Sequence, residues 1–383
     1  MTGGARGCAT ILVVVGTRPE AIKMAPLIRR LQRADEFKVL VCSTGQHREM
    51  IRQVFDLFSI SPDIDLDIMR ADQKLNELAS RVLLGMESVL AAHCPDRVLV
   101  HGDTTTTAAA TLAAYHHKIP VGHVEAGLRT GDIYSPWPEE MNRRVTDAIA
   151  DRLYAPTNAA RDNLIAEGVP GANIVVTGNT VIDALLDMQK GPLCESASEL
   201  EARFPFLSNG KRTILVTCHR RESYGAGFQG VCAALQNLAG RRDVQIVFPI
   251  HRNPNVRSAF RGLGEESNIL LVDPLDYLDF VYALSKSFLV LTDSGGIQEE
   301  APSLGKPVLV MRNVTERPEA VNAGTARLVG TDTGLIVAAA SELLDDPDRY
   351  EAMSTIHNPY GDGKACERII ASLARDFGHD TNG

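Results

Sequence analysis

Three carboxylates in the first half of the chain have the types and spacing that acid–base chemistry requires. Asp103 follows one short apolar run and Glu125 follows the next, which places both acids at the ends of neighbouring predicted strands. Glu139 comes just before a predicted helix, after a loop that holds the only tryptophan of the sequence. Carboxylates gathered at one sheet edge can act as acid or base. For Asp103, an N-cap of the threonine-rich helix that follows is the alternative.

A turn in the first half carries cations suited to a phosphate. Residues 16–20 directly follow an apolar run, and Gly16 would permit a tight turn that presents Arg18 at the sheet edge. Lys23 lies one turn further along the predicted helix. Two cations beside a helix N-terminus suit a phosphate or pyrophosphate. The alternative is a surface ion pair between Arg18 and Glu20.

A second turn, in the second half, has the composition of a nucleotide-binding element. Ser294, Gly295 and Gly296 end a strand and open a helix, so their amides and the serine hydroxyl can bind phosphate oxygens. Glu300, further along that helix, can reach ribose hydroxyls. Arg317 follows the next strand and could close the phosphate site. A simple N-cap at Ser294 and a surface ion pair at Arg317 are the alternatives.

Histidines also mark strand ends in the second half. His219 and Arg220 follow its first strand, in the topological position that Arg18 has in the first half, and His251 ends the next strand. His219 could titrate near neutrality. Residues 225–230 match GxGxxG, but six polar residues separate them from the preceding strand and no acid ends the next one. We therefore expect a flexible turn entering a helix, with neither an NAD(P) site nor any other cofactor.

Short apolar runs alternate with helical patterns along the whole chain, which predicts parallel sheets with helices on both faces. Residues 191–210, with two prolines and little strand character, are interpreted as a linker. We expect two doubly wound, Rossmann-like domains facing a central cleft. Residues 1–188 would carry the acids, residues 189–361 would bind the nucleotide, and a helix over 362–377 can pack on the first domain. The predicted strands are 11–15, 38–42, 97–100, 120–124, 174–177, 213–217, 244–249, 269–272, 288–292 and 307–310.

Composition narrows the class of protein. The formal net charge of -9 argues against non-specific nucleic-acid binding, which needs clustered cations. The seven cysteines are widely spaced and form no CxxC motif, so neither a disulfide framework nor a metal site is expected. The first apolar run, 11–15, is too short to span a bilayer, and no membrane partner is expected. Cytoplasm is the expected location.

Seven segments together resemble the non-hydrolysing UDP-N-acetylglucosamine 2-epimerases. The resemblance runs in one order from about residue 10 to about residue 370, and its motifs are long. The segments are 16–26, 102–106, 122–131, 136–143, 177–180, 219–222 and 293–309.

The resemblance implies a glycosyltransferase-B-type fold and an isomerase that interconverts UDP-N-acetylglucosamine and UDP-N-acetylmannosamine. A base would take the proton from carbon 2 while UDP leaves carbon 1, and 2-acetamidoglucal would be reprotonated on its other face. The implied catalytic residues are Asp103, Glu125, Glu139 and His219, with the face that each serves left open. The implied substrate-binding residues are Arg18, Lys23, His219, Arg220, Ser294, Gly295, Gly296, Glu300 and Arg317.

The resemblance further implies a homodimer that supplies a cell-surface polysaccharide, and some relatives bind a second UDP-N-acetylglucosamine as an activator. This chain has Glu49 and Asp72 where activator-dependent relatives can have Gln and Arg, so activation is left open. The residues of that second site would include Gln46, Glu139, Arg220 and His251.

Three alternatives remain. A hydrolysing epimerase would release free N-acetylmannosamine, but the intact segment 127–143 argues against it. A glycosyltransferase of the same fold would need an acceptor, for which the loop around Trp137 leaves little evident room. A non-catalytic sugar-nucleotide sensor would have no need to retain every candidate acid.

Overall fold

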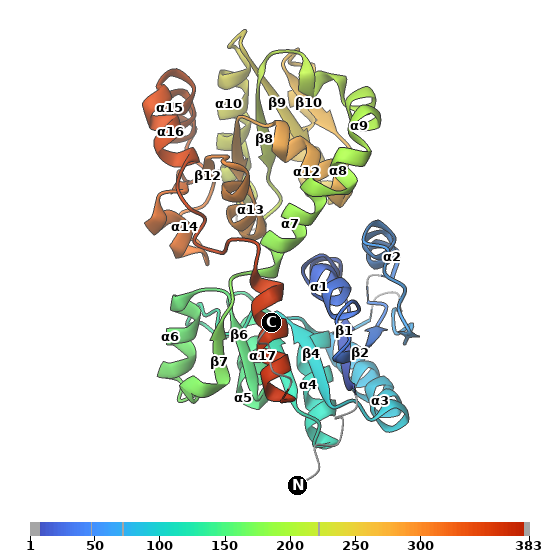
Figure 1. The fold of residues 1–383 in the computed structure, drawn as a ribbon. Coiled ribbons are helices and arrows are strands. Elements are labelled where there is room, and N and C mark those ends of the chain that lie inside the picture. Colours follow the sequence, from blue (N-terminus) through green and yellow to red (C-terminus); the bar gives the residue numbers. More distant parts are fainter. Residues whose placement is uncertain (1–7, 47, 71–72, 221–222, 379–383) are drawn as a thin grey trace. The chain divides into compact units, whose positions relative to one another are not determined.

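The computed structural model describes residues 8–46, 48–70, 73–220 and 223–378. It divides into two compact units (Figure 1). The first unit comprises residues 1–184 and 361–383, and the second comprises residues 185–360. No helix within the described ranges has the length and apolar character that crossing a bilayer requires.

The first unit is built on a seven-stranded parallel sheet with the order β3-β2-β1-β4-β5-β6-β7. The order reverses between β1 and β4, and ligands of open α/β sheets bind outside the strand ends at such a switch point. The turns that follow β1 and β4 are those of Arg18 and Asp103. The strands are β1 (Ala9–Val15), β2 (Phe37–Ser43), β3 (Ile64–Asp65), β4 (Arg97–His101), β5 (Val121–Val124), β6 (Arg152–Ala155) and β7 (Ile174–Val176).

Helices pack on the first sheet in layers. Helices α3, α4 and α5 lie side by side, while α1 lies between α2 and α17. The central strands β1 and β4 contain continuous runs of buried Val, Leu and Ile, as expected for a sheet covered on both faces. The helices are α1 (Arg18–Leu31), α2 (Arg48–Leu57), α3 (Leu75–His93), α4 (Thr105–His116), α5 (Glu139–Ile149), α6 (Asn158–Ala166) and α17 (Ala365–Asp376). Helix α7 (Thr180–Lys190) begins in the first unit and continues into the second, because the boundary lies after Ala184.

The second unit repeats the plan with a six-stranded parallel sheet in the order β10-β9-β8-β11-β12-β13. The predicted class of two doubly wound α/β domains is therefore confirmed. The strands are β8 (Arg212–Thr217), β9 (Val244–Pro249), β10 (Ile269–Val272), β11 (Leu289–Thr292), β12 (Val308–Val310) and β13 (Ala326–Leu328). The helices include α10 (Ala226–Ala239), α11 (Pro254–Phe260), α12 (Tyr277–Lys286), α13 (Gly295–Glu300), α14 (Pro318–Ala323), α15 (Thr333–Asp345) and α16 (Pro347–Ser354).

The last helix, α17, is held to the first unit by buried charges. Asp376 accepts hydrogen bonds from Arg97 Nη1 at 2.8 Å and from Arg152 Nη2 at 2.5 Å. At the other end of α17, the Asp183 carboxylate accepts from the backbone amides of Ala365 and Cys366. These bonds cap the helix N-terminus, where a carboxylate is favourable.

The segment 191–210 differs from the expected linker. It forms α8 (Pro192–Glu195), α9 (Ala197–Arg203) and a 3₁₀ turn over Pro205–Ser208. Arg203 pairs with Asp279, and the Phe206 carbonyl accepts from Gln245 Nε2 at 2.6 Å. The segment is thus packed on the second unit, and its Leu200 and Leu207 are buried.

The glycine-rich segment 225–230 enters a helix, as predicted, with Gly225 in the turn and the remaining residues in the first turns of α10. Gly225 has φ of +75° at the start of α10, a conformation that favours glycine. A Cβ on Gly230 would lie 2.2 Å from the Thr331 carbonyl oxygen, and Thr333 Oγ1 donates to the Gly230 carbonyl at 2.9 Å. Gly230 therefore serves the close packing of α10 against the segment before α15.

Candidate active site

The turn after β1 is organised by Glu20, which is buried. Its Oε2 accepts from the amides of Gly16 at 2.9 Å and Thr17 at 2.6 Å. Its Oε1 accepts from the hydroxyls of Thr104 at 2.6 Å and Thr107 at 3.0 Å. Glu20 is therefore an internal tie between the starts of α1 and α4, and the alternative of a surface ion pair with Arg18 is wrong.

Gly16 has a different role from the predicted one. A Cβ at this position would lie 2.2 Å from Thr106 Oγ1 and 2.7 Å from Thr44 Oγ1. Close packing, rather than a turn conformation, requires glycine here. Arg18 begins α1 and is half-buried.

Asp103 is fixed by α5. Arg143 Nη2 donates to Asp103 Oδ2 at 2.5 Å, and Asn142 Nδ2 donates to the Asp103 carbonyl at 2.9 Å. The N-cap of α4 is Thr104, whose hydroxyl accepts from the Thr107 amide, so the N-cap alternative for Asp103 is wrong. The Asp103 side chain is 30% exposed, so its carboxyl remains accessible to a ligand.

Glu125 lies just beyond β5 with φ of +67°, which is uncommon for a residue other than glycine. Strained backbone of this kind clusters at functional sites. The carboxylate is buried, and its Oε2 forms an ion pair with Lys23 Nζ. Asn179 Nδ2 donates to the same oxygen at 3.2 Å, and His101 Nε2 also lies 3.2 Å from it. Lys23 thus contacts a candidate acid.

Glu139 is the first residue of α5, with Pro138 at the N-cap position. Its Oε2 is buried and has no hydrogen-bond partner among the described residues. A buried carboxylate oxygen without a partner is costly and calls for an explanation, such as a ligand. The loop before α5 leaves Tyr134 77% exposed and Trp137 63% exposed.

These groups meet in one pocket of about 440 Å³ inside the first unit. Its walls come from the turns after β1, β4 and β5 and from the start of α5, which explains how residues far apart in sequence converge. The pocket is lined by Thr17, Pro19, Glu20, Lys23, Gln46, Leu75, His101, Gly102, Asp103, Thr104, Thr105, Glu125, Pro138, Glu139 and Asn142.

In the second unit, the turn after β8 is tied to the end of β11 by Asp293, which is fully buried. Asp293 Oδ2 accepts from the amides of His219 at 2.7 Å and Arg220 at 2.8 Å. The His219 ring stacks on His251 with centroids 5.5 Å apart. Burial, together with Arg220 and His251, lowers the pKa of His219, although Asp293 opposes this. His219 is therefore held toward its neutral form.

The serine–glycine turn of the second unit lies next to two predicted partners. Ser294 occupies the N-cap position of α13, yet its side chain makes no capping bond, which disfavours the simple N-cap alternative. A Cβ on Gly295 would be 3.9 Å from Arg317 Cζ, and one on Gly296 would be 4.0 Å from Glu300 Oε2. The turn, Arg317 and Glu300 therefore form one cluster.

Arg317 and Glu300, the two charged groups of that cluster, each form a hydrogen bond with a neighbouring side chain. Arg317 Nε donates to Glu299, and Tyr277 donates its hydroxyl to Glu300 Oε1 at 3.3 Å. Glu299 is buried, so the alternative of a surface ion pair for Arg317 is wrong.

The predicted second-site residues are divided between the units. Gln46 and Glu139 line the pocket of the first unit, and Gln46 Oε1 accepts from Thr106 Oγ1 at 3.1 Å. Arg220 and His251 belong to the second unit. Asp72, and the motif residues Arg221 and Glu222, lie outside the described residues.

Four residues of the site were not singled out from the sequence: His101, Asn142, Arg143 and Asn179. His101 ends β4 and carries the same strand-end signal as Glu125. Arg143 and Asn142 lie one turn after Glu139 on α5, so helical spacing could have indicated them. Nothing local indicates that Asn179 would contact Glu125.

Comparison with known proteins extends this picture over the whole chain. The family model described as UDP-N-acetylglucosamine 2-epimerase matches residues 29–374. The UDP-N-acetylglucosamine 2-epimerase of Escherichia coli K12 is 57% identical over 367 residues, covering 95% of this chain and 98% of that one.

Solved structures agree. The Neisseria meningitidis UDP-GlcNAc 2-epimerase bound to UDP-GlcNAc matches with a TM-score of 0.90 and 49% identity, covering 96% of this chain and 100% of that one. The Methanocaldococcus jannaschii enzyme, in complex with UDP-GlcNAc and UDP, matches with a TM-score of 0.81 and 34% identity, covering 96% and 99%.

The fold and the pocket of acids define an α/β enzyme with two Rossmann-like sheets. The extent and identity of the matches are decisive for its family. The chain belongs to the UDP-N-acetylglucosamine 2-epimerase family, which is a family of isomerases.

Proposed function

We propose that this chain interconverts UDP-N-acetylglucosamine and UDP-N-acetylmannosamine by eliminating UDP and adding it back to the other face of 2-acetamidoglucal. The observation that carries the proposal is the pocket that brings Asp103, Glu125 and Glu139 together. A carbon 2 proton without an adjacent carbonyl is only weakly acidic, so its removal must accompany loss of the leaving group. Two faces of the sugar require two proton-transfer groups, and the pocket offers three carboxyls for these roles.

The environments of the three acids differ, which supports a division of roles. Glu125 contacts a cation and an amide. Glu139 has a buried oxygen without a partner among the described residues. Asp103 is anchored by Arg143 and remains partly exposed. Different surroundings of this kind allow similar carboxyls to take separate acid and base roles.

Departure of UDP requires cations and amides aimed at the developing charge. In this proposal Arg18 and Lys23 act from the first unit. The groups of the second unit that would stabilise the departing UDP are His219, Arg220, Arg317, Ser294 and the amides of Gly295 and Gly296. Glu300 would bind the ribose. The clustering of Arg317 and Glu300 around the two glycines supports this assignment.

Solvent deuterium tests the proposal. The purified chain is incubated with UDP-N-acetylglucosamine in D₂O without added NAD, and both UDP-sugars are analysed by mass spectrometry and NMR. We expect one deuterium at carbon 2 of both sugars. Epimerisation with retention of the original hydrogen would exclude elimination, and release of free N-acetylmannosamine would identify the hydrolysing alternative.

Asp103→Asn provides the matched variant, because it preserves shape and removes the ionisable proton. Epimerisation should fall about 10²–10⁴-fold, the usual contribution of a positioned acid or base. Wild-type activity in Asp103→Asn would remove this residue from the mechanism.

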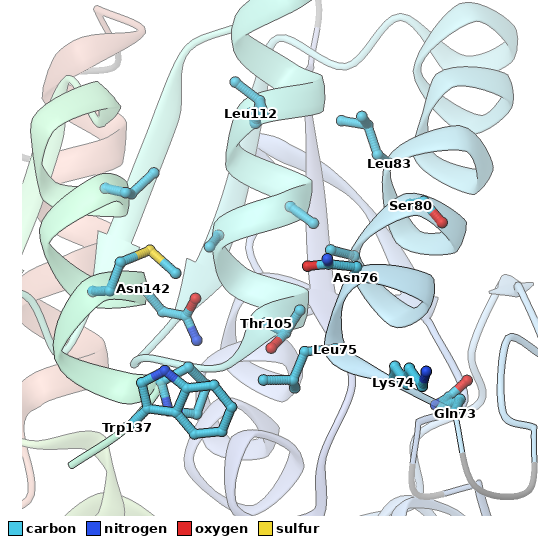
Figure 2. Close-up of a pocket in the computed structure, with 16 residues that line it drawn as sticks. Gln73, Lys74, Leu75, Asn76, Ser80, Leu83, Thr105, Leu112, Trp137 and Asn142 are labelled. Carbon is cyan, nitrogen blue, oxygen red and sulfur yellow. The ribbon is translucent and has the colours of Figure 1, made fainter. Parts of the chain in front are cut away.

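We also infer that two copies associate through a groove on the first unit. The groove, of about 890 Å³, lies between α3, α4 and α5, and Figure 2 shows Trp137 and Leu75 at one end and Leu83 and Leu112 along its walls. Of the residues placed along it, Lys74 alone is charged. An exposed apolar surface of this kind favours a protein partner. Leu75, Thr105, Pro138 and Asn142 line both this groove and the acid pocket.

Light scattering after size-exclusion chromatography tests the homodimer. Val145→Lys puts a charge in the groove and should yield monomers, while Leu335→Lys, on an exposed position of α15, should not. A wild-type monomer would exclude the homodimer.

We propose that Gln46, Glu139, Arg220 and His251 contribute to a second UDP-N-acetylglucosamine site. The position of Gln46 and Glu139 in one pocket supports it. Adding UDP-N-acetylglucosamine to reactions started from UDP-N-acetylmannosamine should remove an initial lag, and a linear time course without it would argue against activation.

A further inference from the structure

His123 is a fully buried histidine in β5 whose two ring nitrogens both face hydrogen-bond acceptors. Nδ1 lies 2.6 Å from Asp147 Oδ1, and Nε2 lies 2.7 Å from the Gly102 carbonyl oxygen. A backbone carbonyl can only accept, so Nε2 must carry a hydrogen and donate it. One more hydrogen then lies between Nδ1 and the carboxyl of Asp147.

The surroundings of Asp147 hold its carboxyl in place against the ring. The other carboxylate oxygen, Oδ2, accepts from Arg129 Nη1 at 2.8 Å and from the Gly127 amide at 3.2 Å. Burial on its own would raise the pKa of Asp147, but His123 and Arg129 hold it below its ordinary value. Both oxygens of Asp147 therefore have partners.

Charge balance makes such a buried group tolerable. Arg129 also donates two hydrogen bonds to Glu167, at 2.8 and 2.6 Å. In the hydrogen-bond chain Glu167–Arg129–Asp147–His123, the Arg129 cation lies between two carboxylates and each group is hydrogen-bonded to its neighbour. Paired and hydrogen-bonded charges avoid most of the penalty for an isolated buried ion.

This series of hydrogen bonds ends at the peptide group that joins Gly102 to Asp103. The Gly102 carbonyl belongs to the peptide plane that joins Gly102 to Asp103, and Gly102 itself has φ of +67°. Asn142 holds the carbonyl on the other side of Asp103. Both peptide planes that flank this acid are therefore fixed, and both anchors run to α5.

We infer that His123 is a positioning residue for the epimerisation: a buried imidazole, held by Asp147, that donates from Nε2 to the Gly102 carbonyl and so orients the Asp103 carboxyl toward the sugar. The inference rests on the proposed function, because it assigns His123 a role through Asp103. It touches no substrate atom itself.

The hydrogen on Nε2 can be observed without any turnover. The protein is labelled with ¹⁵N-histidine, and the His123 signals are assigned by comparison with His123→Gln. We expect Nε2 of His123 at the shift of a protonated nitrogen, since it donates to the Gly102 carbonyl. An Nε2 at the shift of an unprotonated nitrogen would overturn the inference, whatever the enzyme catalyses.

Kinetics then tests positioning. In His123→Gln and Asp147→Asn we expect kcat to fall about 100-fold, the effect of misplacing a reacting group by about 1 Å. KM for UDP-N-acetylglucosamine should stay within about threefold, because the proposed nucleotide contacts are elsewhere. Partial unfolding of a variant would lower the concentration of active sites rather than kcat. The concentration of active sites is therefore measured by UDP titration and used to calculate kcat.

His116→Gln, at an exposed position of α4, is the matched control and should retain wild-type kcat. Wild-type kcat in His123→Gln would refute the positioning role. If wild-type protein takes up no deuterium at carbon 2, the proposed function itself fails, which is a separate result.

Discussion

Arg143 Nη2 and Asp103 Oδ2 are 2.5 Å apart, and this contact joins an arginine on α5 to an acid 40 residues earlier in the chain. Arg143 is buried, and its other terminal nitrogen donates to the buried Glu140 at 2.9 Å. One guanidinium thus holds a structural carboxylate and a candidate catalytic one, and the orientation of Asp103 depends on it.

Replacing Arg143 with Lys keeps the charge but loses the planar fork that serves two carboxylates. We expect kcat to fall about 100-fold through misplacement of Asp103. Steady-state kinetics on the folded fraction measures this. Arg161→Gln, in an exposed pair on α6, provides the comparison and should leave kcat unchanged. Equal rates in both variants would show that Asp103 needs no such anchor.

Glu20→Gln tests the tie between α1 and α4. All four groups around Glu20 donate to it, so an amide nitrogen would face donors and leave at least one bond unmade. The free energy of unfolding should decrease by about 1–3 kcal/mol, as measured by urea denaturation. Glu36→Gln, at an exposed position, should change it little. Unaltered stability of Glu20→Gln would contradict the bonding described here.

Low pH should decrease the stability of the second unit, because it protonates Glu316. Burial would raise its pKa, but the hydrogen bond and charge of Arg312 dominate and lower the pKa of Glu316 to about 2. A carboxyl with a lowered folded-state pKa stabilises the fold fully above its unfolded value of 4.5. That stabilisation is lost as the pH falls from this value toward about 2.

Arg312→Met should therefore reduce the free energy of unfolding at neutral pH by about 2 kcal/mol. It should also flatten the decline of stability between pH 4.5 and about 2. Urea denaturation over a pH series measures both effects. Arg349→Gln, in an exposed pair, should leave the curve unchanged. Parallel curves for wild type and Arg312→Met would rule out this pair as a source of acid sensitivity.

Gly230→Ala tests the close packing of α10. The added methyl would meet the Thr331 carbonyl oxygen at 2.2 Å, so the helix or the facing segment must shift. Overpacking of this kind costs about 1–3 kcal/mol, which thermal unfolding would detect. Gly262→Ala has open space around it and serves as the control. Similar melting temperatures for the two variants would contradict the close packing of Gly230 against Thr331.

The convergence of Asp103, Glu125 and Glu139 could be predicted because parallel strands end at one sheet edge. Helical spacing could equally have indicated Arg143. The role of Glu20 could be predicted only in part. Thr17 and Glu20 have the spacing of a capping box, but the other two donors to Glu20, Thr104 and Thr107, lie more than 80 residues away in sequence.

Three short strands, β3, β6 and β13, could not be predicted because they also depend on contacts between distant segments. The strand β3 has two residues and β13 has three, too few for a period of two to emerge. In β6 the pattern is interrupted by Arg152, whose charge is satisfied by Asp376 from the far end of the chain. Packing between distant segments, rather than local preference, decides such elements.

The return of the chain to the first unit after residue 360 has a consequence during synthesis. Residues 185–360 form the second unit as an uninterrupted stretch, so it can be completed while the ribosome is still translating. The first unit, although begun earlier, waits for Asp376 to reach Arg97 and Arg152. A chain that stopped after residue 360 would yield one finished half and one in which Arg97 and Arg152 lack the Asp376 carboxylate.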